Sequence, residues 1–180
     1  TLSFVARVAA PFRQDECTDP YKSKRRNGGA LLDTPIYDPT SKNYFELIGI
    51  KGGAPYDRAL RMARKKTYKG FRGRLAIIRS ASTQQNIDRC LMPGREAGIG
   101  LRFSCTRRVL LWADGKLLRP DKDYVNWGPN WHYANDHPPC YPGDKFAGVT
   151  LAPISQGGYA GNGLSWFVIS SRHSVDYSII

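Results

Sequence analysis

The order of hydrophobic patterns along the chain constrains its fold more than any other feature. Residues 55–66 (PYDRALRMARKK) place apolar side chains at helical spacing, which predicts an amphipathic helix with Pro55 at its first position. Residues 80–91 (SASTQQNIDRCL) predict a second helix, because Ser80 is a favourable N-cap residue. The apolar face of the first helix comprises Tyr56, Ala59, Leu60 and Ala63.

Strand patterns precede, separate and follow the two helices. Residues 44–50 (YFELIGI) alternate and lead to Gly52-Gly53, which predicts a strand and a turn. Residues 74–80 (RLAIIRS) predict a short core strand centred on Leu75–Ile78. Two early helices and several late strands indicate an α+β fold. The later strand patterns are 108–115 (RVLLWADG), 146–153 (FAGVTLAP), 164–170 (LSWFVIS) and 174–180 (SVDYSII).

Glycine and proline punctuate the chain densely. With 18 Gly and 12 Pro among 180 residues, we expect short elements joined by loops and not a helical bundle. Residues 1–43 have no sustained period and predict an extended, basic, Pro- and Gly-rich arm. Such an arm is ordered only where its own domain or a partner holds it. The compact domain is predicted to comprise residues 44–180.

The overall charge favours an anionic partner. Lys and Arg exceed Asp and Glu by 27 to 15, a net charge of +12. Such an excess attracts polyanions, acidic protein surfaces and acidic membrane surfaces. Hydrophobic residues make up 41% of the chain, enough for a core, but no apolar stretch of about 18 residues predicts a transmembrane segment.

The positive charge is concentrated between residues 51 and 74. This stretch holds nine Lys or Arg residues and one acid, Asp57, so its balance is +8. A solvated helix face is one interpretation, but surfaces usually mix both signs, and we predict an anionic-partner site. Tyr56, Tyr68 and Phe71 lie among the cations, as nucleic-acid stacking requires, yet no ribonucleoprotein signature accompanies them, so nucleic acid is the less favoured partner. The predicted contact residues are Arg58, Arg61, Arg64, Lys65, Lys66, Lys69 and Arg72.

Several motifs follow one another in a characteristic order. After the two helical patterns come GIGL (98–101), LLWADG (110–115), YVNW (124–127) and the final SVDYSII. In this order, residues 44–180 resemble the C-type lectin-like domain family. The helical and strand positions that carry the resemblance are Ala59, Ala63, Gly73, Leu75, Ala76, Ser80 and Ile87.

The resemblance implies a double-looped domain. It would contain two helices, small antiparallel sheets and a long loop region, and its two ends would meet in one sheet. It also implies an extracytoplasmic location, secreted or lumenal, whereas an organelle-associated complex is the alternative. The chain departs from the family in its cysteines: Cys17, Cys90, Cys105 and Cys140 cannot form the family's two usual bridges, and their pairing stays open.

A second departure concerns calcium. Sugar-binding members of the family hold this ion with a Glu-Pro-Asn type triplet in the long loop and a Trp-Asn-Asp triplet on the next strand. Here residues 128–130 are Gly-Pro-Asn and residues 165–167 are Ser-Trp-Phe. Calcium requires about six to eight oxygen ligands, but hydrogen, indole and phenyl stand at Gly128, Trp166 and Phe167. We therefore predict a calcium-independent domain, with no metal and no cofactor.

The long loop offers candidate contacts of another kind. Within residues 127–140 (WGPNWHYANDHPPC), Trp127 is expected to pack in the core and Trp131 to contact a partner or a glycan, supported by the amides of Asn130 and Asn135. The spacing of the metal-binding residue types in this loop matches no metal template. Those residues are His132, Asp136, His137 and Cys140.

These observations predict a non-catalytic interaction or structural module. No nucleophile elbow, HExxH motif or P-loop is present in the sequence. We expect the module to dock to a protein or an anionic surface, as an accessory subunit of a larger assembly. One alternative is a carbohydrate-binding lectin, and the other is an organellar subunit that contacts RNA or a membrane complex.

Overall fold

The structure is a computed structural model that describes residues 35–91, 96–128, 140–153 and 164–180. Short strands and two helices of ten residues each alternate within these ranges. In chain order, the elements are β1 (Ile36–Asp38), β2 (Asn43–Phe45), β3 (Leu47–Ala54), α1 (Tyr56–Lys65), β4 (Thr67–Tyr68), β5 (Phe71–Arg72), α2 (Ala81–Cys90), β6 (Ala97–Ser104), β7 (Val109–Trp112), β8 (Leu117–Leu118), β9 (Phe146–Pro153), β10 (Leu164–Val168) and β11 (Val175–Ile179).

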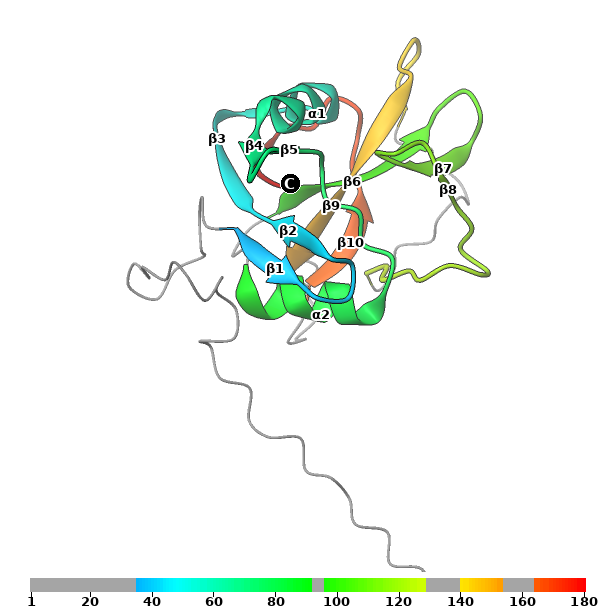
Figure 1. The fold of residues 1–180 in the computed structure, drawn as a ribbon. Helices are drawn as coiled ribbons and strands as arrows, with labels where there is room; N and C mark the ends of the chain where they lie inside the picture. The colour runs from blue at the N-terminus through cyan, green and yellow to red at the C-terminus, as the bar shows by residue number, and fades with distance from the viewer. Residues whose placement is uncertain (1–34, 92–95, 129–139, 154–163) are drawn as a thin grey trace, which may run out of the picture.

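One mixed sheet of seven strands holds the described part of the chain together. Its main path runs β10-β9-β6-β11-β3, while β7 and β8 extend it from β6. The last strand, β11, pairs antiparallel with β3, so that Ile179 lies opposite Leu47. The two ends of the lectin-like part therefore meet in one sheet, as predicted. Figure 1 shows α1 and α2 on opposite sides of this sheet.

The α1 helix follows the predicted pattern. Its apolar face is buried and packs on Ile48, Ile50 and Ile180, while its cations face outward. Pro55 lies one residue earlier than predicted: its extended conformation (φ −66°, ψ 162°) makes it the N-cap. Asp57 in the first turn complements the positive end of the helix dipole. The amphipathic pattern alone was sufficient to place this helix.

The α2 helix also begins where the sequence predicts. Ser80 is the N-cap, and its hydroxyl oxygen accepts a hydrogen bond from the Thr83 backbone N–H at 3.2 Å. The Thr83 hydroxyl donates in turn to the buried carboxylate of Asp38, at 2.8 Å. This contact attaches β1 to the start of α2. Residues 35–43 of the predicted arm form β1 and the start of β2, while residues 1–34 lie outside the described residues.

The prediction of a strand at 74–80 is wrong, although its apolar centre is core. No strand is formed between β5 and α2, yet Leu75–Ile78 is buried throughout. The segment makes single hydrogen bonds to two different strands: the Ala76 N–H donates to Ile179, and the Gly100 N–H donates to Ala76, at 2.8 and 2.7 Å. It meets the end of β11 and the middle of β6 through these single bonds and forms no continuous ladder with either strand.

The predicted strand 44–50 and its turn also differ from the structure. The predicted strand is interrupted at Glu46, whose backbone forms hydrogen bonds with Ile180. As a result, β2 and β3 belong to different sheets. Gly52 and Gly53 do not end the strand. Their positive φ values of 76° and 69° form an irregularity within β3, where the register with β11 shifts. Glycine at both positions accommodates left-handed backbone that would strain other residues.

The described cysteines are all oxidised. Cys105, just after β6, is bridged to Cys140, with their Cα atoms 5.8 Å apart, and Cys90 is also disulfide-bonded. The Cys105–Cys140 bridge ties the end of β6 to the approach to β9. Of the two helices that the described ranges contain, neither is long and apolar enough to cross a membrane.

Candidate binding surface

The outward face of α1 carries a stripe of cations. Arg58, Arg61 and Lys65 follow one another at three- and four-residue spacing, which places them on the same side of the helix, and Arg64 lies beside them. All four side chains are exposed. Asp57 is the one acid on the helix, and no ion pair joins it or any other described acid to these four residues. Their charge is therefore directed to solvent.

The β4–β5 hairpin adds to this surface just after α1. Its two central residues, Lys69 and Gly70, have φ values of 48° and 83°, as a tight type I′ turn requires. Gly73 then returns the chain to the end of α1, where its N–H donates to the Lys66 carbonyl at 2.8 Å. A Cβ at Gly73 would lie 2.5 Å from the Ala63 carbonyl oxygen, so this close return depends on glycine.

Two predicted cations are engaged within the domain. The Lys69 ammonium donates to the Tyr44 hydroxyl at 2.9 Å and lies 4.6 Å from the centre of that ring. Lys66 lies 3.7 Å from the Glu46 carboxylate. Both remain on the surface, but Lys69 holds the hairpin against β2, and Lys66 is paired with the residue that follows β2. The structure thus separates the α1 stripe from two cations that have a structural role.

A group of aromatic side chains lies where the hairpin meets β1 and β2. The rings of Tyr37 and Tyr44 lie 5.1 Å apart, and those of Tyr44 and Tyr68 lie 4.9 Å apart. Phe71 follows at the hairpin end and is 75% exposed. The nucleic-acid stacking arrangement considered above needs a row of free ring faces, but Tyr56 is buried and the three tyrosines pack on one another.

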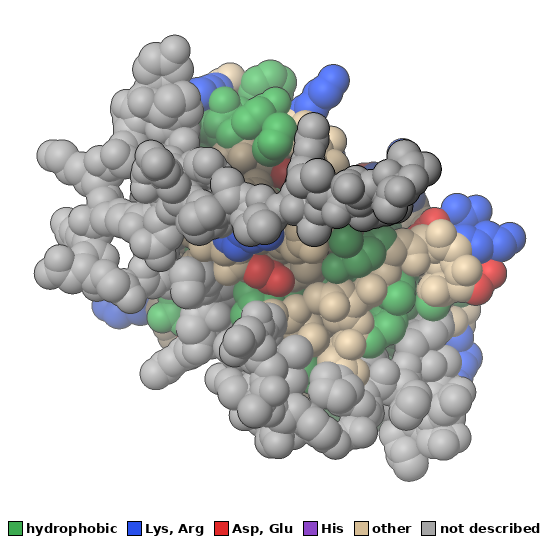
Figure 2. Space-filling model, turned by 90° about the horizontal axis from the view of Figure 1, so that it is seen from below, with side chains coloured by type: hydrophobic (Ala, Val, Ile, Leu, Met, Phe, Trp, Pro, Cys, Tyr) green, Lys and Arg blue, Asp and Glu red, His purple; other side chains and the backbone are tan. Residues whose placement is uncertain are grey.

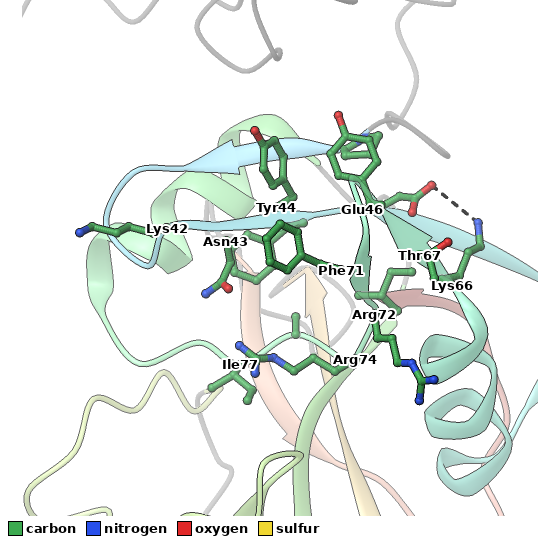
Figure 3. Close-up of a pocket in the computed structure, with 16 residues that line it drawn as sticks. Lys42, Asn43, Tyr44, Glu46, Lys66, Thr67, Phe71, Arg72, Arg74 and Ile77 are labelled. Carbon is green, nitrogen blue, oxygen red and sulfur yellow. Dashed lines mark ion pairs between the residues drawn. The ribbon is translucent and has the colours of Figure 1, made fainter.

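A pocket of about 310 Å³ lies between β2, the hairpin and the segment that follows it (Figure 3). In Figure 3, the Phe71 ring projects over the pocket, and Arg74 runs beneath it towards Ile77. Arg72 points away from the pocket towards α1. Lys66, which directly follows α1, also lines the pocket, so the pocket adjoins the C-terminal end of this helix.

The other side of the molecule differs in charge. The α2 helix carries a single cation, Arg89, next to Asp88. Figure 2, which shows the molecule from the side of α2, has scattered Lys and Arg side chains with acidic side chains among them. Arg79, close to the predicted cluster in sequence, belongs to neither surface, because it forms an ion pair with Asp114 at 2.8 Å. The α2 helix therefore lacks the row of same-sign charges that α1 carries.

The predicted calcium-loop positions are filled by packed rings. Trp166 is fully buried, and its indole N–H donates to the Gln84 side-chain oxygen at 2.8 Å. Trp127 is half-buried against it, with ring centres 5.5 Å apart. A Cβ at Gly128 would lie 2.4 Å from the Phe167 ring, so a Glu side chain at this position would collide with the phenyl group. Within the described ranges, no group of three His, Cys, Asp or Glu residues could hold a metal.

The predicted loop contacts cannot be placed. Trp131, Asn130 and Asn135 lie outside the described residues, so their roles stay predictions. Sequence reasoning missed the pocket, which combines Tyr44, Phe71 and Arg74 with the end of the chain. One signal was present in the sequence: Lys69-Gly70 between short aromatic segments is compatible with a hairpin, although Asn-Gly or Asp-Gly is the more usual indicator.

The architecture has the features that the sequence predicted for a C-type lectin-like α+β fold: two helices and a sheet in which β3 and the last strand, β11, pair. No family model matches the chain, and no curated protein does. Solved structures similar to it include CEL-IV, with 18% identity and a TM-score of 0.49 over 76% of this chain and 84% of that one. C-type lectin CEL-I from Cucumaria echinata has 13% identity and a TM-score of 0.47, covering 76% and 87%. The human scavenger receptor C-type lectin carbohydrate-recognition domain has 21% identity and a TM-score of 0.45, covering 75% and 88%.

Proposed function

We propose that this domain is a calcium-independent, non-catalytic interaction module that docks to an acidic protein surface. The supporting observation is the exposed stripe Arg58, Arg61, Arg64 and Lys65, to which no described acid is paired. Exposed charges of one sign steer a complementary partner and strengthen its docking. An accessory subunit of a larger assembly would use such a surface as a permanent contact.

Calcium independence is supported by the packing around Phe167. The phenyl ring occupies the space that a side chain at position 128 would need. Trp166, on the same strand, is fully committed to the core. Gly128, Trp166 and Phe167 contribute no side-chain oxygen, and calcium is held by oxygen ligands.

Binding of an acidic probe tests the proposal. The probe is a fluorescein-labelled peptide of twenty glutamates, measured by anisotropy with calcium and with EDTA. We expect the affinity to be the same under both conditions and to fall steeply when salt rises from about 50 to about 200 mM, because screening weakens exposed charge pairs. The charge-reversal variant Arg58→Glu/Arg61→Glu should bind at least about tenfold more weakly.

A matched control separates a docking face from net charge. Lys122→Glu/Lys145→Glu changes the total charge by the same amount at two exposed positions outside α1. We expect this control to keep most of the wild-type affinity. Equal losses in both variants would show a non-specific effect of charge and contradict the proposal. Chelator-sensitive binding on a glycan array would instead favour a lectin, and tighter binding of an RNA oligonucleotide than of the glutamate peptide would favour the RNA-contacting subunit.

A further inference from the structure

We infer that the pocket beneath Phe71 receives an apolar side chain of the acidic partner segment, while Arg74 binds a carboxylate next to it. The inference rests on the proposed function, since it gives the α1 docking surface its apolar anchor and identifies the partner as a protein segment. It assigns roles to three groups outside the predicted contact set: Phe71, Arg74 and the pocket floor.

The floor of the pocket is apolar. Phe45, Ala76 and Ile77 line it and are themselves nearly inaccessible, and the final residue, Ile180, completes it. At about 310 Å³, the pocket lies at the lower end of the roughly 300–1,000 Å³ typical of ligand sites. This size suits one or two apolar side chains. Burying such side chains supplies a favourable term that salt does not screen.

The rim of the pocket is cationic. Lys42, Lys66 and Arg74 line it, against one acid, Glu46, which lies beside Lys66. Arg72 also lines the pocket, but its guanidinium points towards α1. Arg74 is exposed, and no described acid forms an ion pair with it. A guanidinium can bind a carboxylate through two parallel hydrogen bonds. The charge of the rim therefore complements an acidic segment that carries an apolar residue.

Phe71 is placed for contact by its hairpin. Three quarters of its surface is exposed, so the ring contributes little to the core of the domain. The tight Lys69-Gly70 turn and the contacts of Tyr44 with Tyr68 and Lys69 hold the hairpin in place. A rigidly presented aromatic beside a pocket is typical of residues that dominate binding energy in protein interfaces.

A glycan fits this pocket less well than a protein segment. Sugar hydroxyls need several hydrogen-bonding groups around them, but the floor provides side chains of Phe, Ala and Ile. The amide N–H of Asn43, on the rim, already donates to the Ser41 carbonyl at 3.0 Å. Apolar burial with a flanking cation matches a peptide anchor.

Two acidic hexapeptides of equal charge test the inference. Both contain four Asp or Glu residues, and the central pair is leucine-phenylalanine in one and serine-serine in the other. Affinities are measured by fluorescence anisotropy for the full chain. We expect the wild-type protein to bind the leucine-phenylalanine peptide at least about tenfold more tightly, since burial of its large apolar side chains outweighs the entropic cost of binding.

Protein variants test whether the pocket causes the preference for the leucine-phenylalanine peptide over the serine-serine peptide. Phe71→Ser should reduce it to about twofold or less, while Leu117→Ser, which removes another exposed apolar side chain (46% exposed, on β8), should leave it unchanged. Arg74→Gln should weaken both peptides by at least about threefold. Circular dichroism and thermal unfolding of each variant check that the fold is retained.

The outcomes distinguish this inference from the proposed function. If the wild type binds both peptides equally, or if Phe71→Ser keeps the preference, the pocket assignment is wrong while the docking face stands. Arg58→Glu/Arg61→Glu should weaken both peptides and leave their ratio unchanged. If neither peptide nor the glutamate probe binds, both proposals are wrong.

Discussion

At the scale of single residues, Trp166 links the core to the surface of α2. Its indole N–H donates to the Gln84 oxygen, and the Gln84 amide N–H donates to the Asp88 carboxylate at 2.6 Å. Rings of Trp112, Tyr124 and Trp127 surround the indole edge to face, at 5.5–5.7 Å. An indole so enclosed cannot turn outward, so the strand position is structural. Sequence reasoning identified Trp166 as a non-ligand but could not identify its hydrogen-bond partner Gln84, which lies 82 residues earlier in the chain.

The Asp88 carboxyl group is the last acceptor in the series of hydrogen bonds from Trp166 through Gln84, and it is partly buried. Burial raises its pKa to about 6, despite hydrogen bonds from Gln84 and the Leu164 backbone N–H, which lower it. The folded state therefore holds the proton more tightly than the unfolded state, whose pKa is near 3.8. The stabilisation that comes with protonation is fully present below about pH 4 and is lost as pH rises through about 6.

The variant Asp88→Asn tests this link. It should stabilise the domain at pH 7 by about 1 kcal/mol, because Asn keeps the acceptor for Gln84 without the desolvated charge, and solvent screening limits the gain. The gain should vanish below about pH 4. Urea unfolding at pH 4, 5.5 and 7 measures it. Asp121→Asn, which changes an exposed carboxylate, should have little effect, and a destabilised Asp88→Asn protein at pH 7 would contradict the prediction.

At the scale of elements, the crossing of residues 74–78 over β6 depends on Gly100. A Cβ at this position would lie 2.5 Å from the Leu75 carbonyl oxygen and 2.7 Å from that of Ala76. Both atoms belong to backbone that is buried and cannot move independently of the core. The close approach lets Leu75 reach the α1 side of the core and Ile78 the α2 side. Without glycine, this irregular segment would be displaced from both.

We therefore expect Gly100→Ala to destabilise the domain by about 1–3 kcal/mol, the usual cost of overpacking. Gly49→Ala is the matched control, because Gly49 also lies in a strand but a Cβ added there would meet no atom within 4 Å. That variant should be neutral within about 0.5 kcal/mol. Chemical denaturation of both proteins measures the free energies of unfolding. Equal values for the two variants would show that residues 74–78 can shift to accommodate a Cβ at position 100 without loss of stability.

At the scale of the whole molecule, the sheet and a disulfide join regions that are distant in sequence. The pairing of β3 with β11 closes the domain, and β6 contacts β7, β9 and β11. The Cys105–Cys140 bridge spans 35 residues between β6 and the approach to β9. A bridge of this span reduces the freedom of the unfolded chain, and its stabilisation is global.

Removing the bridge by Cys105→Ser/Cys140→Ser should lower the free energy of unfolding by about 2–4 kcal/mol. Thermal and urea unfolding measure the change. Binding of the glutamate peptide at a temperature where the variant remains folded should be retained, because α1 lies outside the bridged loop. Loss of binding in a folded variant would mean that the loop contributes to the docking face.

The sequence predicted the parts of the fold that depend on local periodicity. Both helices, the Ser80 cap and the later strands are readable from side-chain spacing alone. The prediction of a strand at 74–80 was wrong because a run of apolar residues indicates that a segment is buried but does not indicate which backbone groups it pairs with. The break at Glu46 likewise depends on Ile180, which lies at the other end of the chain.

The sequence by itself determined the two amphipathic helices, the excess of cations on one of them and the absence of oxygen ligands at Gly128, Trp166 and Phe167. Each of these follows from residue type and spacing within a few positions. Tertiary structure alone decided that Phe71, Arg74 and Ile180 share a pocket and that Lys69 is turned onto Tyr44. The physical reason is that the pairing of β3 with β11 and the turn of the hairpin bring together residues whose separation along the chain carries no signal of contact.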